Sequence, residues 1–345
     1  MMIKWKKYIE ENKKSFWKLN LNICRMKFYI KTNNEKVFLM IRERYFYAIK
    51  NGGKKVDFFL NLIFIEDKNK FKLPVYKSNR AKLLSSWRYR LDGKVLRSSI
   101  YKYGNITFCD QEEASFCFWD KKRGVIFILA SDIINSQWLG YLSDLMVLDV
   151  LRKRGYITLH ASAVTIGKKG IIFPAYSGGG KSTLALFLLE NGSNFLSDDI
   201  IILRKERKKF YMYSLSNYLS LKKIDAYHYS SRYKAFLKKG KVKSNGYKIF
   251  FRANELYPNS ILDRASVNLI LFPHLYTSGK IKIKKLSVKY TFNKLLQHAT
   301  FLGISYKNKK VSSLLKALAE NTKSYNFYIG RKLDELSGKI QELIR

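Results

Sequence analysis

The run PAYSGGGKST, residues 174–183, constrains the fold of this chain more than any other stretch. It places three consecutive glycines directly before a lysine and two hydroxyl side chains, between the apolar runs GIIF and LALFLL. A short apolar run bounded by turn residues is typical of a buried strand, and the second run repeats its apolar residues at helical spacing. The sequence therefore predicts a strand, a glycine loop and a helix, in that order.

A loop of this kind is suited to binding a phosphate group. Glycines let several backbone N–H groups converge without obstruction by Cβ atoms, and the helix N-terminus adds the positive end of its dipole. Lys181 would neutralise the β- and γ-phosphates of a nucleotide, and the Ser182 hydroxyl would hold Mg²⁺. The expected nucleotide-binding residues are Ser177, Gly178, Gly179, Gly180, Lys181, Ser182 and Thr183. The alternative is a glycine-rich turn that merely joins a strand to a helix.

The loop departs at one position from the phosphate-binding pattern G-x-x-x-x-G-K-S. The first glycine of that pattern is replaced by Ala175. If this position needed a left-handed backbone, alanine would cost about 1–2 kcal/mol, whereas in an extended backbone it would cost almost nothing.

A histidine and an acidic pair flank the loop in the sequence. His160 lies in YITLHASAV (156–164), and Asp198 and Asp199 lie in NFLSDDIIIL (194–203); both runs are predicted strands. Two adjacent carboxylates after a phosphate-binding unit favour a place near a metal ion, the alternative being a turn or a helix cap. For His160 the alternative is a core histidine whose nitrogens are both satisfied.

Taken together, these residues resemble the catalytic core of the HPr kinase/phosphorylase family and of its relatives that phosphorylate serine or peptide hydroxyls, including the kinases of lasso-peptide gene clusters. The resemblance covers residues 156–203 and, more weakly, the run SVNLILF at 266–272. That family carries a histidine before the loop, the motif G-x-S-G-x-G-K-S and a paired aspartate on the next strand. The Glu-Ile-Arg-Gly segment of the HPr-specific enzymes does not occur after Leu203, and Ala161 stands where those enzymes have glycine. The resemblance is therefore closer to the peptide-kinase branch.

The resemblance implies transfer of the γ-phosphoryl group of ATP, with Mg²⁺, to a hydroxyl, expected to be serine, of a peptide, protein or small molecule. It implies that Asp198 accepts the hydroxyl proton and that Asp199 and Ser182 hold the metal ion. Lys181 would stabilise the transferring phosphate, and His160 would orient Asp198 or contact that phosphate. Phosphate donors other than ATP stay open, and the family's tendency to assemble is compatible with a homo-oligomer.

The chain divides where its periodicity changes. Residues 1–131 predict a mostly β N-terminal region. We expect this region either to recognise the acceptor or to support the rest of the chain. Its antiparallel strands are expected in KFYIKT, KVFLMI, VDFFLNLIFI, NITFCD, ASFCFW and GVIFILA. Residues 132–155 predict a connecting amphipathic helix, with Ile134, Trp138, Leu142, Leu145 and Leu148 at helical spacing. Residues 156–345 alternate strands and helices, which predicts an α/β, P-loop kinase-like domain. Its last helix is marked by Leu333, Leu336, Ile340 and Leu343.

The charge of the chain points to an acidic partner. Lys and Arg number 66 against 26 Asp and Glu, a formal net charge of +40, with clusters such as RKERKK (204–209), KKGKVK (238–243) and KIKIKK (280–285). Such a surface attracts polyanions in a salt-dependent way, and an acidic acceptor would fit it. The alternative function is a nucleotide-binding, nucleic-acid-binding protein, with Tyr247, Phe250 and Phe251 stacking on bases.

The sequence also bears on localisation. The N-terminal stretch carries charges every few residues and lacks the apolar core of a signal peptide. The apolar runs GVIFILA and LMVLDVL fall well short of the roughly 18 residues needed to span a bilayer. We therefore expect a cytoplasmic protein without a membrane span.

Overall fold

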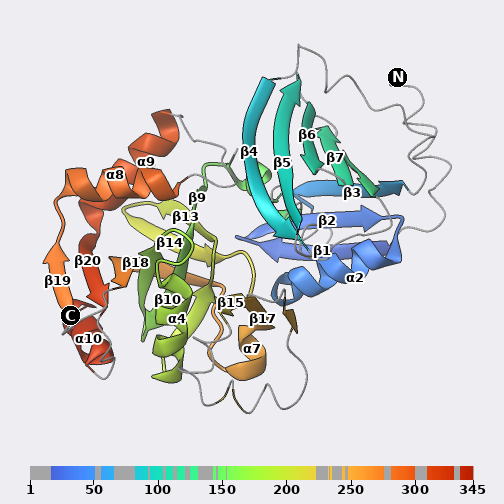
Figure 1. Ribbon diagram of the computed structural model, residues 1–345. Helices are drawn as coiled ribbons and strands as arrows, with labels where there is room; N and C mark the ends of the chain where they lie inside the picture. The colour runs from blue at the N-terminus through green and yellow to red at the C-terminus, as the bar shows by residue number, and fades with distance from the viewer. Residues whose placement is uncertain are drawn as a thin grey trace. The chain divides into compact units, whose positions relative to one another are not determined.

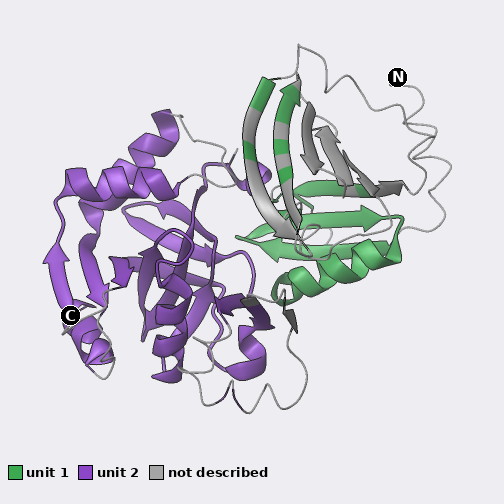
Figure 2. Ribbon diagram, viewed as in Figure 1, with its two compact units in different colours: residues 1–147, 302–304 green, residues 148–301, 305–345 purple. Residues whose placement is uncertain are grey.

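The computed structural model describes residues 17–50, 56–65, 82–91, 94–103, 106–111, 115–120, 125–130, 143–144, 147–152, 154–222, 232, 234, 243–244, 248–275, 281–299, 309–329 and 335–344. The chain forms two compact units, unit 1 with residues 1–147 and 302–304 and unit 2 with residues 148–301 and 305–345 (Figure 2). The boundary after Val147 falls within the segment expected to connect the two halves. In the described part, no helix is both long and apolar enough to cross a bilayer.

Unit 1 is built on an eight-stranded sheet (Figure 1). Its strands are β1 (Trp17–Ile23), β2 (Met26–Thr32), β3 (Phe58–Ile65), β4 (Lys82–Leu91), β5 (Lys94–Tyr103), β6 (Ile106–Gln111), β7 (Ser115–Asp120) and β8 (Val125–Ala130). The strand order is β1-β2-β3-β8-β7-β6-β5-β4. Strand β3 runs parallel to β2 and β8, and the other neighbours are antiparallel. The prediction of a mostly β, mostly antiparallel region is confirmed.

One run expected to be a strand is a helix. KVFLMI lies in α2 (Glu35–Arg44), which is followed by the 3₁₀ helix η2 (Phe46–Ala48). The side chain of Asn34 accepts a hydrogen bond from the amide of Val37 and so caps the first turn. Val37 and Ile41, one turn apart, are buried. The prediction was wrong because a continuous apolar run carries no period that separates strand from helix.

The expected connecting helix is described only in part. Residues 143–144 and 147–152 are helical, whereas Ile134, Trp138, Leu142 and Leu145 lie outside the described residues. Within unit 1, the buried carboxylate of Asp144 accepts a hydrogen bond of 2.8 Å from the Tyr45 hydroxyl and pairs with Arg44. These contacts attach this part of the chain to the C-terminal end of α2.

Unit 2 contains a nine-stranded sheet and a small three-stranded sheet. The large sheet comprises β9 (Ile157–Leu159), β10 (Ala161–Ile166), β11 (Lys169–Pro174), β12 (Asn194–Ser197), β13 (Ile201–Glu206), β14 (Lys209–Ser214), β18 (Arg264–Leu275), β19 (Lys282–Lys285) and β20 (Lys323–Ile329). Its main order is β12-β10-β11-β18-β14-β13-β9, with β20 pairing β18 and β19. Strand β18 runs parallel to β11 and β20. The small sheet comprises β15 (Tyr218–Lys222), β16 (Lys243–Ser244) and β17 (Lys248–Arg252).

Helices cover both faces of the large sheet. They are α4 (Lys181–Glu190), α8 (Val288–His298), α9 (Lys309–Asn321) and α10 (Leu336–Ile344), whereas α7 (Ala253–Leu256) packs with the small sheet. Successive residues of β11 point to opposite faces. Ile172 belongs to the core cluster that includes α8 and α9, whereas Ile171 and Phe173 belong to the one with α4 and α10. Unit 2 is thus a layered α/β structure, as predicted.

The helix after the glycine loop is buried on more than one side. Leu184 and Leu188 are buried in one core cluster with α10, and Leu186 and Leu189 are buried in a second cluster with the small sheet. The helix ends at Glu190, and Gly192 follows in a left-handed backbone with φ of 83°, as is usual just after a helix. In the last helix, Leu336 and Ile340 are buried and Leu343 is partly buried, while Leu333 lies outside the described residues.

Two predicted strands are each broken in the middle. YITLHASAV divides into β9 and β10 at His160, and NFLSDDIIIL divides into β12 and β13 at 198–200. Strand β10 pairs with β12 near one end of the sheet, and β9 pairs with β13 at the other end. The sheet must therefore curl so that these ends meet, and the chain crosses between them at His160 and again at Asp198 and Asp199. The residues at these breaks are outside the strand ladders.

Candidate functional site

The glycine loop lies between the C-terminal end of β11 and the N-terminus of α4. Gly178 and Gly180 have φ of 85° and 86°, a left-handed backbone that glycine adopts at little cost. The amide of Gly179 donates to the carbonyl of Tyr176 at 3.0 Å, which closes the turn. A Cβ atom on Gly178 would meet nothing within 4 Å. The loop is thus open at Gly178 and leads directly into the helix N-terminus.

Alanine fits the first position of the loop motif. The described non-glycine residues with positive φ are Cys24, Arg25, Asp199 and Arg207, so Ala175 carries no left-handed strain. The side chain of Ala175 leaves no room for a side chain at position 179, because a Cβ atom on Gly179 would lie 2.9 Å from the Ala175 Cβ atom. Alanine at position 175 therefore requires glycine at position 179.

Lys181 is the first residue of α4 and is buried. Its Nζ atom lies 2.8 Å from Oδ1 of Asp199. Burial alone would lower the pKa of Lys181, but the carboxylates of Asp199 and Asp198 outweigh it and raise the pKa. Lys181 therefore carries a positive charge beside the glycine loop. Of the other loop residues expected to bind nucleotide, Ser177 is exposed and Thr183 is half-buried.

Asp198 is buried and accepts three hydrogen bonds. The hydroxyls of Ser182, at 2.8 Å, and Ser162 donate to Oδ1, and the amide of Ser220 donates to Oδ2 at 3.0 Å. Burial and the neighbouring Asp199 raise the pKa of Asp198, an effect that Lys181 and the donors from Ser162 and Ser220 partly offset. The acidic pair is thus brought to the glycine loop, with Asp198 against the Ser182 hydroxyl.

Asp199 is the more accessible carboxylate of the pair. Its side chain is 37% exposed, and its backbone has φ of 62°, a left-handed conformation in which aspartate is among the few tolerated residues. Nε2 of His160 lies 3.7 Å from its Oδ1 atom. The sequence paired His160 with Asp198, but the structure places its imidazole beside Asp199. Left-handed residues of this kind cluster at functional sites.

Three residues of the site carried no signal in the sequence. Ser162 and Ser220 bind Asp198 from β10 and β15, and isolated serines match no motif. His298 is buried, its carbonyl accepts from the amide of His160 at 2.8 Å, and its ring lies 4.7 Å from that of Tyr176. Only the fold brings these residues to the loop.

The donor set suits a nucleotide phosphate and Mg²⁺. Gly178 leaves open space beside left-handed glycines, and Ser182 with Asp198 offers the oxygen ligands that Mg²⁺ prefers. Among the described residues, no group of three or more His, Cys, Asp and Glu is arranged to hold a metal ion by itself.

Comparison with known proteins adds little to this geometry. No family model matches the sequence. No curated protein matches it either. Among solved structures, the chain is similar to the Hpr(Ser) kinase/phosphatase from Coxiella burnetii, with 16% sequence identity, coverage of 55% of this chain and 93% of that chain, and a TM-score of 0.31. A likeness this loose transfers no function, and the site stands on the residues of this chain.

Proposed function

We propose that unit 2 is a phosphotransferase that uses ATP and Mg²⁺ to phosphorylate a hydroxyl group, with serine in a peptide or protein as the expected acceptor and a small molecule as the other. The observation that carries this proposal is the 2.8 Å hydrogen bond between Ser182 and Asp198. It joins the hydroxyl that follows the loop lysine to a buried carboxylate, which is how P-loop enzymes hold Mg²⁺.

The geometry supports an exchange of the roles expected for the two aspartates. In this proposal Asp198 and Ser182 hold the metal ion, because their oxygens already lie together in a buried place. Asp199 acts as the base, because it is partly exposed and lies beside His160. His160 then orients the carboxylate of Asp199.

The proposed reaction needs no covalent enzyme intermediate. The acceptor hydroxyl oxygen bonds to the γ-phosphorus while the bond from that phosphorus to the β–γ bridging oxygen breaks, and ADP leaves. Asp199 takes the hydroxyl proton. Lys181 turns from Asp199 to the phosphates, and the amides of the glycine loop donate to their oxygens. Mg²⁺, when bound, neutralises charge on the β- and γ-phosphates.

The test is transfer of label from [γ-³²P]ATP to an array of serine-containing peptides, with ADP release measured in parallel. We expect Mg²⁺-dependent labelling or slow hydrolysis that Lys181→Ala lowers about a hundredfold, equivalent to about 3 kcal/mol of transition-state stabilisation. Asp199→Asn should lower the rate at every Mg²⁺ concentration. Asp198→Asn should instead raise the Mg²⁺ concentration needed for half-maximal rate.

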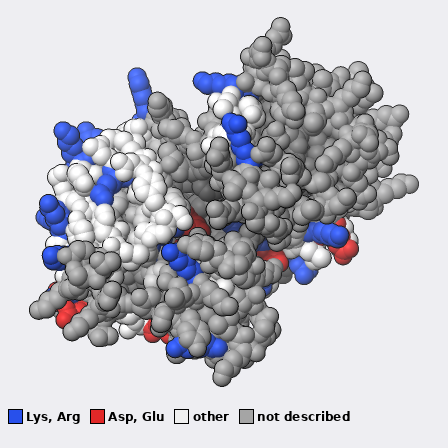
Figure 3. Space-filling model, viewed as in Figure 1, with Lys and Arg blue, Asp and Glu red and all other residues white. Residues whose placement is uncertain are grey.

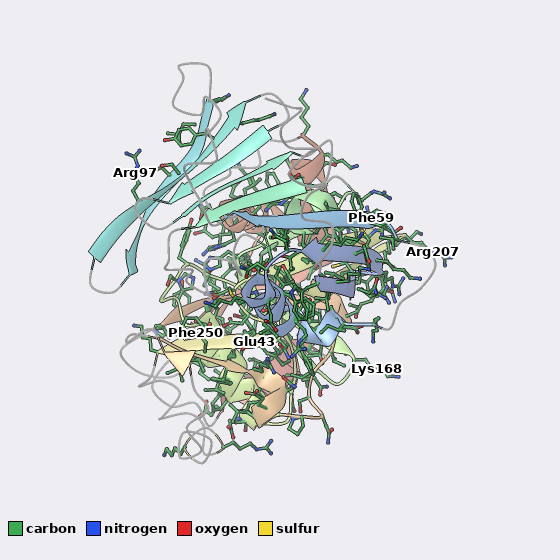
Figure 4. All side chains as sticks on the ribbon, turned by 90° about the vertical axis from the view of Figure 1, so that its right-hand side faces the viewer. Glu43, Phe59, Arg97, Lys168, Arg207 and Phe250 are labelled. Carbon is green, nitrogen blue, oxygen red and sulfur yellow. The ribbon has the colours of Figure 1, made fainter. Side chains whose placement is uncertain are left out.

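Lys168→Ala is the matched control, since Lys168 is exposed at the tip of the β10–β11 turn, as Arg207 is at the β13–β14 turn (Figure 4). Its activity should equal that of the wild type. The proposal is wrong if Lys181→Ala and Asp199→Asn both leave labelling and ADP release unchanged. If Asp199→Asn, and not Asp198→Asn, raises the Mg²⁺ concentration needed for half-maximal rate, then Asp199 holds the metal ion and Asp198 is the base, as the resemblance implied.

A further inference from the structure

A second lysine, Lys294, lies beside the C-terminal end of β18 and the middle of β20. Nζ of Lys294, in α8, lies 3.5 Å from Nε2 of His274, in β18. The same ring nitrogen lies 3.1 Å from Oδ1 of Asn326, in β20. The ring of His274 also stacks on Tyr328, with centroids 4.9 Å apart. We refer to Lys294, His274 and Asn326 as the β18–β20 cluster.

The cluster lies beside the glycine loop. Strands β11, β18 and β20 are parallel, so their C-terminal ends lie at one edge of the sheet, the edge where open α/β sheets bind ligands. The glycine loop follows β11, and His274 is next to Leu275 at the end of β18. A Cβ atom on Gly180 would lie 2.8 Å from Cδ2 of Leu275. Leu275, the residue after His274, therefore packs against the loop. On the side of α8, His298 lies one turn after Lys294 and its ring lies 4.7 Å from that of Tyr176 in the loop.

The hydrogen bonds within the cluster are not mutually satisfied. If Nε2 of His274 carries a proton, it donates to Asn326 and presents that proton to the ammonium group of Lys294. If Nε2 carries no proton, it accepts from Lys294 and presents its lone pair to the oxygen of Asn326. With Oδ1 of Asn326 facing the ring, either tautomer leaves one contact opposed. An acceptor placed between Lys294 and protonated His274 would remove the opposition.

The ammonium group of Lys294 has aromatic neighbours in place of an acidic partner. It lies 5.0 Å from the ring centroid of Phe272 and 5.7 Å from that of Tyr290, within the range of cation–π attraction. Among the described residues, no Asp or Glu forms an ion pair with Lys294. Burial lowers the pKa of Lys294. A half-buried cation without a counter-ion favours the binding of an anion.

We propose that Lys294 and His274 bind an oxyanion, a carboxylate or a phosphate, of the molecule that unit 2 phosphorylates. The oxyanion would accept hydrogen bonds from Nζ of Lys294 and from the Nε2–H group of His274, taking the place of Asn326 as acceptor, while the stacked ring of Tyr328 holds the imidazole. This inference rests on the proposed function, because the ligand is the phosphoryl acceptor only if unit 2 is a phosphotransferase. It narrows the acceptor to molecules with an acidic group near the reacting hydroxyl.

Exposed apolar side chains on the same elements are suited to contact the rest of the acceptor. Tyr176 in the glycine loop, Leu275 at the end of β18 and Tyr290 in α8 are 60%, 61% and 52% exposed. Large apolar side chains exposed close together indicate a binding surface more often than scattered ones do. A peptide with an acidic residue near its serine would have contacts for both parts.

The test is histidine NMR on the whole protein, which contains four histidines and therefore gives few ring signals. The Mg²⁺ complex of a non-hydrolysable ATP analogue is added first, to fill the glycine loop. Inorganic phosphate and, separately, succinate are then titrated at constant ionic strength. We expect a saturable shift of the His274 ring signals, and the titrant with the lower apparent Kd identifies the oxyanion. In Lys294→Met the apparent Kd should rise about tenfold, since a charge-assisted hydrogen bond is lost.

Lys289→Met is the matched control, because it removes the same charge from an exposed position of α8; its titration should follow the wild type. Lys294→Arg should keep binding within a few fold. The inference is overturned if neither titrant shifts His274, or if Lys289→Met and Lys294→Met weaken binding equally. These outcomes are independent of catalysis. If this protein binds the anion at His274 but neither labels a peptide nor releases ADP, the proposed function is rejected and the anion site stands.

Discussion

At the scale of single residues, the site depends on burying charged groups around a loop that stays open. Lys181 and Asp198 are 4% and 6% exposed, yet each faces an opposite charge or hydrogen-bond donors. Burying a charge without such partners would cost several kcal/mol. The sequence singled out Lys181 by its place directly after the glycines, and Asp198 as half of the acidic pair that follows the loop and helix. It could not identify Ser162 or Ser220, because their role depends on where β10 and β15 pass Asp198.

His298 gives a prediction at this scale. Burial, with the positive charges of His160, Lys294 and Lys181, lowers its pKa to about 4 from an unfolded value of 6.5. The folded state therefore binds the proton less well, and the stability present above pH 6.5 is lost as the pH falls toward 4. His298→Phe keeps a ring against Tyr176 and should reduce this loss by up to about 3 kcal/mol. Urea denaturation at pH 7 and pH 4.5 measures the free energy of unfolding of the wild type and of His298→Phe. If both proteins lose the same free energy of unfolding between these pH values, the imidazole of His298 is not buried in its neutral form.

At the scale of secondary-structure elements, the sequence predicted the strand, loop and helix around the glycines because each has a local signal. It missed the breaks at His160 and at Asp198 and Asp199, because residues on both sides of each break are apolar and read as one strand. Tertiary structure, not local sequence, interrupts these two runs. Each half pairs with a different neighbour in the curled sheet, and the break frees the functional side chains from the ladder.

The glycine loop gives a prediction at the element scale. Gly179→Ala would place a Cβ atom 2.9 Å from that of Ala175 and 3.2 Å from the Tyr176 carbonyl. The loop must shift, and we expect weaker ATP binding and a lower melting temperature. Adding Ala175→Gly removes the closer of the two contacts, so the double variant should recover part of both losses. Calorimetry and thermal unfolding of the three proteins test this, and a double variant no better than Gly179→Ala would show that the crowding lies elsewhere.

At the scale of the whole molecule, charge is the dominant feature. The described part of the face in Figure 3 carries Lys and Arg at many separate places and few Asp or Glu. Exposed charges of this kind attract any polyanion and are screened by salt. The proposed nucleotide site differs, because it relies on a buried lysine and backbone amides. Of the aromatics considered for stacking on bases, Phe251 is buried in the core and Tyr247 lies outside the described residues.

The most direct test of the account is calorimetric titration of ATP with Mg²⁺ into the whole protein at about 0.3 M salt, where exposed charges are largely screened. We predict one bound ATP per chain, an affinity that single-stranded oligonucleotide does not reduce, and a loss of about tenfold or more in Lys181→Ala with none in Lys168→Ala. Equal affinity in Lys181→Ala and wild type, or displacement of ATP by the oligonucleotide, would contradict the claim that the loop at 177–183 binds a nucleotide for phosphoryl transfer.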